Sequence, residues 1–362
     1  MVSRVGIVGD GVIGMAIALV AASRGISVTL FGDHTPGAAS PASAGMLAPS
    51  VERSDGPGQA FSDAARAAWP RLLELVRVQG DPGFRLTQQG ILQVALTEAD
   101  ADRLQRSLRG PDRWLGAAEA RRAEPALQPN LVGAAHFMDD GLADVPSALA
   151  SLERATLRHP LIARHRTPLR RLDACGAQLT LTDAAGADHE VDHGVLAAGV
   201  WSPTLEGLPR ALPVTPLRGT LAAVGVPLLS VPVYGPDGHC YVLPREGGTV
   251  IGATADAVGF DATPGPSDLS TLQRTGSSIL PALAAAPITQ HWTGLRPMTP
   301  DRLPILGPDP ALPALLYACG HSRNGFLQAA LTAEVIADLL TGTDRADIGP
   351  FAVDRFIERL NT

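Results

Sequence analysis

Hydrophobic positions at the start of the chain form two apolar runs separated by a glycine-rich turn and a helical stretch. The first run covers residues 4–8 (RVGIV), the helical stretch covers residues 15–25 (MAIALVAASRG), and the second run covers residues 26–31. Parallel strands that are buried on both faces have continuous apolar sequences of this kind. The pattern therefore predicts a β-α-β unit at the start of the chain.

Further along the chain, helical spacing alternates with strand patterns. Helical spacing occurs at residues 62–78, 98–122, 143–157, 269–283 and 326–340, and strand patterns occur at residues 90–96, 169–174, 177–191, 194–199, 217–226, 239–245 and 248–254. The strand at 194–199 ends in small residues at a turn, which indicates that the chain returns there to the first sheet. This order predicts an α/β (α+β two-domain) fold whose domains interleave in sequence.

The length of 362 residues agrees with two domains, because a domain averages roughly 150 residues. We expect a Rossmann-like nucleotide-binding domain made of residues 1–84, 140–208 and 291–362. A β-rich substrate-binding domain is expected to comprise residues 85–139 and 209–290.

Composition excludes several classes of protein. Hydrophobic residues make up 45% of the chain and charged residues 18%, which excludes a disordered polyelectrolyte. The net charge of −7 leaves no basic face for nucleic acid. All 29 basic residues are arginine, so no lysine is present for Schiff-base chemistry. The apolar start is interrupted by glycines and an aspartate, which argues against a signal peptide or a membrane helix.

The three cysteines bear on compartment and metal binding. Cys175, Cys240 and Cys319 are scattered and form no CxxC pair. Their spacing indicates neither a disulfide framework nor a zinc site. We therefore expect a cytoplasmic protein without a metal centre.

Gly9, Gly11 and Gly14 match the G-x-G-x-x-G fingerprint between a strand and a helix. The glycines allow a tight turn and leave the N–H groups of the helix N-terminus free for a pyrophosphate. The acid that usually binds the ribose is expected near position 32, but that residue is Gly32, so the neighbouring Asp33 or a water molecule is left to contact the ribose. No arginine stands there for a 2′-phosphate, so NADP is disfavoured and FAD and NAD remain.

Four further segments resemble the D-amino-acid-oxidase superfamily of flavoenzymes, and within it the glycine oxidase branch. They are residues 40–48 (SPASAGMLA), 197–202 (AAGVWS), 294–301 (GLRPMTPD) and 320–325 (GHSRNG), in matching order over essentially the whole chain. The resemblance implies an FAD domain interleaved with a β-rich substrate domain. It also implies oxidation of a small amine by O2 with release of hydrogen peroxide.

The fingerprint and the resemblance together give a set of expected FAD contacts. The set comprises Gly9, Gly11, Val12, Ile13, Gly14, Asp33, Ser40, Ser43, Ala44, Gly45, Met46, Leu169, Ala198, Gly199, Trp201, Arg296, Ser322, Arg323, Asn324, Gly325, Phe326 and Leu327. Some relatives attach flavin through a cysteine or activate O2 with a lysine. Because Gly294 stands in the matching region and the chain has no lysine, we expect non-covalent FAD and oxygen activation by another charge, such as Arg323 or His239.

Arg296, Tyr241, Arg323 and His239 are the candidate catalytic residues. Arg296 stands in a stretch of low polarity and needs an anionic partner, which a substrate carboxylate held bidentately or a salt bridge to Asp301 would supply. Tyr241 and His239 alternate on a predicted strand, so both side chains could face one cavity. In the family, the matching tyrosine bonds the carboxylate, the matching histidine lines the pocket, and the turn around Arg323 lies by the flavin pyrimidine edge.

The resemblance implies a reaction in which Arg296 and Tyr241 hold the carboxylate of glycine or an N-substituted glycine. The α-carbon gives hydride to flavin, and the imine hydrolyses to glyoxylate plus ammonia or a primary amine. Sarcosine and small D-amino acids are alternative substrates, and thiamine thiazole synthesis and secondary metabolism are alternative uses. An NAD-dependent dehydrogenase and a non-catalytic FAD-binding subunit are the alternatives from other classes. Homotetramers occur in this branch, so a homo-oligomer stays open.

Overall fold

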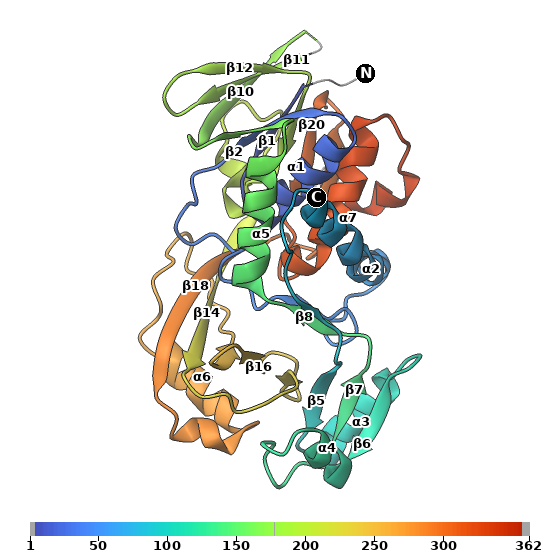
Figure 1. The fold of residues 1–362 in the computed structure, drawn as a ribbon, viewed down its shortest axis with the longest axis vertical. Helices are drawn as coiled ribbons and strands as arrows, with labels where there is room; N and C mark the ends of the chain where they lie inside the picture. Colours follow the sequence, from blue (N-terminus) through green and yellow to red (C-terminus); the bar gives the residue numbers. More distant parts are fainter. Residues whose placement is uncertain (1–3, 177, 357–362) are drawn as a thin grey trace.

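The computed structural model describes residues 4–176 and 178–356, so the outermost ends of the predicted nucleotide-binding domain lie outside the described residues. Figure 1 shows an elongated molecule in which a mixed upper part sits above a lower part built mainly from strands. The predicted α/β fold class is confirmed. Among the described residues, no helix combines the length and the apolar character needed to cross a membrane.

A six-stranded sheet forms the centre of the upper part. In spatial order it contains β19 (Ile305–Asp309), β20 (Leu312–Cys319), β13 (His193–Leu196), β1 (Arg4–Val8), β2 (Ser27–Phe31) and β9 (Ile162–His165). All neighbours pair in parallel except β19 and β20, which are antiparallel. The predicted β-α-β unit is therefore present, and the strand near residue 194 does return to the first sheet.

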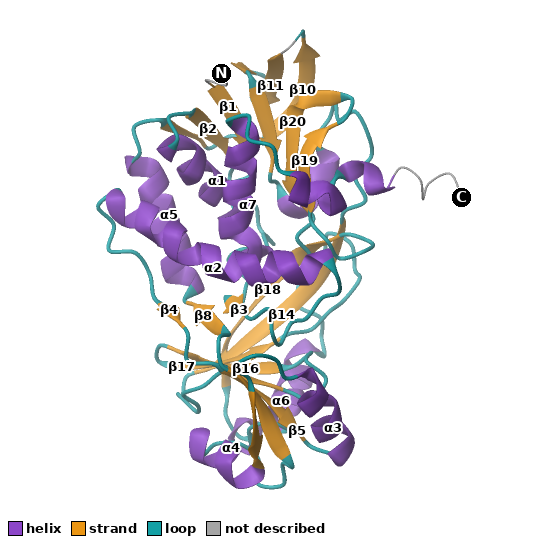
Figure 2. Cartoon of the chain, turned by 90° about the vertical axis from the view of Figure 1, so that its right-hand side faces the viewer, coloured by secondary structure: helices purple, strands orange, loops and turns teal. Residues whose placement is uncertain are grey.

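Helices cover one face of this sheet and a small sheet covers the other (Figure 2). The helices are α1 (Val12–Ser23), α2 (Pro57–Val78), α5 (Val145–Arg158) and α7 (Gly325–Leu340), and the small sheet contains β10 (Leu169–Cys175), β11 (Gln178–Asp183) and β12 (Asp188–Val191). Ile7 and Leu30 pack towards the helices, whereas Val8 and Phe31 pack towards the small sheet. Burial on both faces explains why β1 and β2 are apolar throughout.

The lower part contains an eight-stranded sheet. Its order is β18 (Ile288–Met298), β14 (Thr215–Val224), β17 (Gly248–Gly252), β16 (Tyr241–Arg245), β15 (Val233–Tyr234), β5 (Ile91–Ala95), β7 (Gly133–Phe137) and β6 (Arg113–Gly116). Helices α3 (Glu98–Ser107), α4 (Ala117–Ala123) and α6 (Asp268–Ser277) pack against it. A further three-stranded sheet, of β3 (Met46–Leu47), β8 (Gly141–Ala143) and β4 (Leu86–Thr87), lies between the two parts (Figure 2).

Two local expectations differ from the structure. The Arg-rich stretch 98–122 is not one helical region, because β6 separates α3 from α4. The strand expected at 239–245 begins only at Tyr241, since residues 235–240 form a turn closed by the hydrogen bond from Gly235 N–H to the Cys240 carbonyl. The domain boundary at residue 291 stays a prediction. Residue 291 lies within β18, which pairs with β14 from Ile288 to Met298.

Candidate active site

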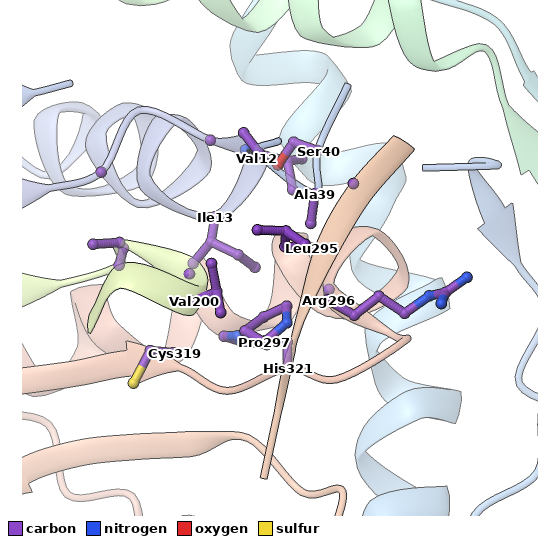
Figure 3. Close-up of a pocket in the computed structure, with 18 of the residues that line it drawn as sticks. Val12, Ile13, Ala39, Ser40, Val200, Leu295, Arg296, Pro297, Cys319 and His321 are labelled. Atoms are coloured by element: carbon purple, nitrogen blue, oxygen red, sulfur yellow. Dashed lines mark hydrogen bonds between the residues drawn. The ribbon is translucent and has the colours of Figure 1, made fainter. Parts of the chain in front are cut away.

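A cavity of about 340 Å³ runs between the two large sheets, within the range of roughly 300–1,000 Å³ that ligand pockets occupy. Its walls come from the carboxyl ends of β1, β2 and β13, the start of α1, the segment before β3, strands β14, β16 and β18, and the turn before α7. Figure 3 shows side chains from these separated segments around one space, with Ile13, Ser40 and Val200 close together and Arg296 extending to one side.

One end of the cavity is the glycine-rich turn. Gly11 is the N-cap of α1, and the Val12 N–H donates to the Ser40 hydroxyl oxygen at 3.0 Å. The first turn of α1 carries no acidic side chain, so its N–H groups can face an anion. Gly14 lies behind this turn rather than in the cavity wall, because a Cβ there would lie 1.8 Å from the Gly9 carbonyl oxygen.

Most of the expected cofactor contacts line this cavity. They are Gly9, Gly11, Val12, Ile13, Asp33, Ser40, Ser43, Ala44, Met46, Leu169, Ala198, Gly199, Trp201, Arg296, Ser322, Arg323, Gly325 and Phe326. Gly14, Gly45, Asn324 and Leu327 are not among the lining residues. Leu327 instead accepts the Trp69 indole N–H through its carbonyl oxygen at 3.0 Å, which fixes α7 on α2.

Arg296, on β18, lies at the other end of the cavity. Its guanidinium extends away from Val12 and Ser40 (Figure 3). Nη1 donates to the Thr254 carbonyl at 3.0 Å, and a Cβ on Gly219 would lie within 2.5 Å of three guanidinium atoms, so only glycine leaves room there. Burial lowers the pKa of Arg296, yet arginine remains charged at neutral pH.

Arg296 forms no ion pair with any carboxylate in the part of the chain that the structure describes. The alternative partner Asp301 is paired with Arg355, at 2.9 Å between Oδ2 and Nε. The structure therefore contradicts a structural salt bridge between Arg296 and Asp301. An enclosed cation without an anion beside a cavity is a site for an anionic ligand.

Tyr241, on β16, lies in the same cavity wall. Its side chain is buried, and burial raises the pKa of Tyr241 to about 12, an effect that the positive charge of Arg296 opposes. Within the described residues, the Tyr241 hydroxyl makes no hydrogen bond. A neutral hydroxyl of this kind can donate to an anion that Arg296 also holds.

Glu52 is a cavity residue that sequence reasoning missed. Its Oε1 accepts hydrogen bonds from the Tyr234 hydroxyl at 2.7 Å and from Arg323 Nη2 at 3.3 Å. The negative charge of Glu52 is the main cause that raises the pKa of Arg323. Arg323 is thus already paired, unlike Arg296. Nothing in the local sequence around Glu52 distinguishes it from a surface glutamate.

The candidate His239 and a second histidine, His321, have different environments. His239 is exposed and does not line the cavity, because it belongs to the turn before β16 rather than to the strand. His321 does line the cavity, but burial lowers its pKa to about 3, and Nε2 lies 3.0 Å from the Thr332 hydroxyl. His321 is therefore neutral near pH 7 and cannot supply positive charge.

One group of described side chains outside the cavity has the spacing of metal ligands, although no metal was expected. Ligand atoms of His165, Asp183 and His189 lie within 4.8 Å of one another. Asp183 Oδ2 lies 3.2 Å from His189 Nε2, and its Oδ1 accepts N–H groups of its own turn. His165 Nε2 lies 3.8 Å from Asp183 Oδ2, so within this group the hydrogen bond joins Asp183 and His189.

Comparisons with known proteins agree with this architecture. A family described as FAD dependent oxidoreductase (DAO) matches residues 4–339. Glycine oxidase of Geobacillus kaustophilus is 34% identical in sequence, with 98% of each chain covered. The crystal structure of glycine oxidase from that species superposes with a TM-score of 0.90 at 33% identity, and the match covers 98% of this chain and 99% of that one.

A second type of relative is longer than this chain. The bifunctional protein ThiO/ThiG of Trichormus variabilis is 31% identical over 98% of this chain and 55% of its own length. Both the family match and the relatives above extend over nearly all of the described elements. The chain therefore belongs to the DAO family of FAD-dependent oxidoreductases.

Proposed function

We propose that this enzyme oxidises glycine or an N-substituted glycine at the α-carbon. When bound, FAD accepts a hydride from the α-carbon and delivers the electrons to O2, which yields hydrogen peroxide. The resulting imine reacts with water to give glyoxylate and ammonia, or glyoxylate and a primary amine. Small carboxylates are therefore the ligands that the cavity must hold.

The single observation that carries this proposal is the unpaired guanidinium of Arg296 at the end of the cavity. Among the described residues, neither Nε nor Nη2 of Arg296 donates a hydrogen bond, whereas Nη1 is held by the Thr254 carbonyl. A guanidinium fixed by one nitrogen presents its other donors to a carboxylate in a bidentate geometry. Arg296 is thus the anchor for the substrate carboxylate.

Tyr241 supplies the second contact to the carboxylate. Its pKa of about 12 keeps the hydroxyl protonated, so it donates rather than repels. Two fixed donors orient the bound amino acid and thereby set the position of its α-carbon relative to the cavity. No protein group has to act as acid or base, and the neutral His321 agrees with this requirement.

The opposite end of the cavity fits FAD. The N–H groups at the start of α1, with Gly11 and Ser40, would hold the pyrophosphate, and the segment containing Ala44 and Met46 would lie against the ring system. The Asn324 Oδ1 is buried without a hydrogen-bond partner among the described residues, which supports a further contact near α7. Gly294 leaves no thiol for covalent attachment, so the cofactor is held non-covalently.

A reducing compartment such as the cytoplasm is part of the proposal. Cys175, Cys240 and Cys319 are all unpaired thiols. Unpaired cysteines persist where the surroundings are reducing.

Anaerobic bleaching of the flavin absorption band tests the function. Glycine, sarcosine, a long-chain N-alkylglycine and D-alanine would be mixed separately with the purified enzyme. Fast bleaching by glycine or by an N-substituted glycine is expected, and peroxide and glyoxylate should form in equal amounts when O2 is admitted. Bleaching by D-alanine alone would move the substrate class to D-amino acids.

Two other outcomes contradict the proposal. A flavin band that no amine bleaches would mean a non-catalytic FAD-binding subunit. A purified protein that binds NAD in place of flavin would mean a dehydrogenase.

A further inference from the structure

Gly32 directly follows strand β2, at the position where dinucleotide-binding domains usually carry an acid for the adenosine ribose. A Cβ built on Gly32 would lie 2.2 Å from Asp10 Cγ, 2.3 Å from Asp10 Oδ1 and 2.4 Å from Asp10 Cβ. The Asp10 side chain therefore fills the space that a side chain at position 32 would need. Both residues line the same cavity.

Asp10 is held in this place by a second residue. Arg164, on β9, donates from Nη2 to Asp10 Oδ2 at 3.0 Å, and the two side chains are only 6% and 11% exposed. His34 Nδ1 lies 3.5 Å from the same oxygen. Asp10 Oδ1 has no hydrogen-bond partner among the described residues, which leaves one carboxylate oxygen free at the cavity wall.

Asp33, the acid next in sequence, is less suited to bind a ribose. It is exposed, and its Oδ1 already accepts the Thr35 hydroxyl at 2.5 Å. No arginine fixes its direction among the ion pairs of the described residues. Asp10 thus meets the requirements of a fixed, enclosed carboxylate, and Asp33 does not.

We propose that Asp10 is the residue that binds the adenosine ribose hydroxyls of FAD, in place of an acid at the end of β2. The carboxylate comes from the glycine-rich turn, Gly32 provides the space for it, and Arg164 fixes its orientation. This inference rests on the proposed placement of FAD in the cavity. It also replaces the expectation that Asp33 contacts the ribose.

A chemical double-mutant cycle tests the contact. Full-length protein freed of flavin would be titrated with FAD and with an FAD analogue whose adenosine lacks the 2′-hydroxyl, and binding would be followed by flavin fluorescence. The same titrations would be made on Asp10→Ala and Asp33→Ala. Charge-assisted hydrogen bonds are typically worth about 10- to 100-fold in affinity, so Asp10→Ala should bind FAD weaker by about that factor.

The analogue distinguishes contact from structural damage. Wild type and Asp33→Ala should both prefer FAD over the analogue, whereas Asp10→Ala should bind both equally. Discrimination that persists in Asp10→Ala, or that disappears in Asp33→Ala, would overturn the inference. The melting temperature of each flavin-free variant is a control. A large drop in Asp10→Ala would show that removing the partner of Arg164 destabilises the fold.

A relocation variant gives an independent test. Gly32→Glu alone should fail to bind FAD well, because its side chain collides with Asp10. Combined with Asp10→Gly it should recover most of the affinity and the discrimination against the analogue, since the acid then stands at the usual position. If the double variant has the melting temperature of wild type but does not recover FAD affinity, the result would contradict the proposal that Asp10 replaces an acid at position 32.

Failure of this inference and failure of the FAD placement give different results. If FAD does not occupy the cavity, Gly11→Val will leave its affinity unchanged. If only the role of Asp10 is wrong, Gly11→Val will weaken FAD binding while Asp10→Ala will not.

Discussion

Arg323 Nη2 lies 3.3 Å from Glu52 Oε1, so the two charges form an ion pair in the cavity wall. Arg296 lines the same cavity and has no such partner among the described residues. The charge of Arg323 is therefore balanced by Glu52, whereas the charge of Arg296 is open to an anionic ligand. This difference makes the site suitable for one carboxylate rather than two, because a second carboxylate would have to compete with Glu52 for Arg323.

We predict that Glu52→Gln broadens the substrate range towards dicarboxylic amines. The change removes the anion that competes for Arg323, and the Tyr234 hydroxyl can still bond the amide oxygen. The ratio of kcat/KM for iminodiacetate to that for glycine should rise about 10-fold, which corresponds to about 1.4 kcal/mol. Steady-state peroxide assays with both substrates measure this ratio.

Glu334→Gln is the matched control, since Glu334 pairs with Arg71 on the surface, away from the cavity. An unchanged ratio in Glu52→Gln, or an equal rise in the control, would contradict the competition between Glu52 and the second carboxylate.

We predict that Arg296→Ala loses most of its activity through substrate binding. The substrate carboxylate would remain enclosed without its charged partner, which costs about 2–5 kcal/mol, so kcat/KM should fall by a factor of about 30 or more. Arg296→Lys should recover only part of this loss, because an ammonium cannot bind a carboxylate bidentately. Arg71→Ala is the control, and kinetics close to wild type in Arg296→Ala would exclude the anchor.

The Tyr241→Phe variant isolates one hydroxyl. Its removal should raise the KM for glycine by about 5- to 20-fold with a smaller effect on flavin content, because one hydrogen bond to a charged group is lost. Tyr317→Phe removes another buried hydroxyl, which donates to Asp309 at 2.8 Å outside the cavity. That control should change thermal stability and leave KM unaltered, and a Tyr241→Phe enzyme with the KM of wild type would rule out the contact.

Features that depend on neighbouring residues could be predicted from the sequence. The glycine turn, α1 and β2 follow directly from the apolar runs around Gly9 and Gly14, and the last helix follows from its spacing. Arg296 and Tyr241 could be singled out because both match the family pattern. In addition, Arg296 stands in a stretch of low polarity and Tyr241 stands on a predicted strand. Both side chains line the cavity, and their roles stay predictions.

Features that depend on contacts between distant parts of the chain could not be predicted from the sequence. Glu52 reaches the cavity only because the segment before α2 passes Tyr234 and Arg323, which are far from it in sequence. His239 was misplaced because strand alternation was extended through a turn that begins at Gly235. At Gly32 the sequence shows only that the usual acid is missing. That the Asp10 side chain occupies the space beside Gly32 depends on the tertiary fold.

We predict that His321 makes the enzyme less stable in mild acid. Burial lowers its folded-state pKa to about 3, against about 6.5 in the unfolded chain, so below pH 6.5 the unfolded chain binds a proton that the folded protein does not. Stability due to this group is complete above pH 6.5 and falls by about 1.4 kcal/mol per pH unit below it, or about 2 kcal/mol at pH 5. Urea unfolding at pH 7 and pH 5 measures the difference. His321→Gln should remove most of it, whereas His291→Gln, at an exposed position, should not. An equal loss of stability on acidification in wild type and His321→Gln would show that other groups cause it.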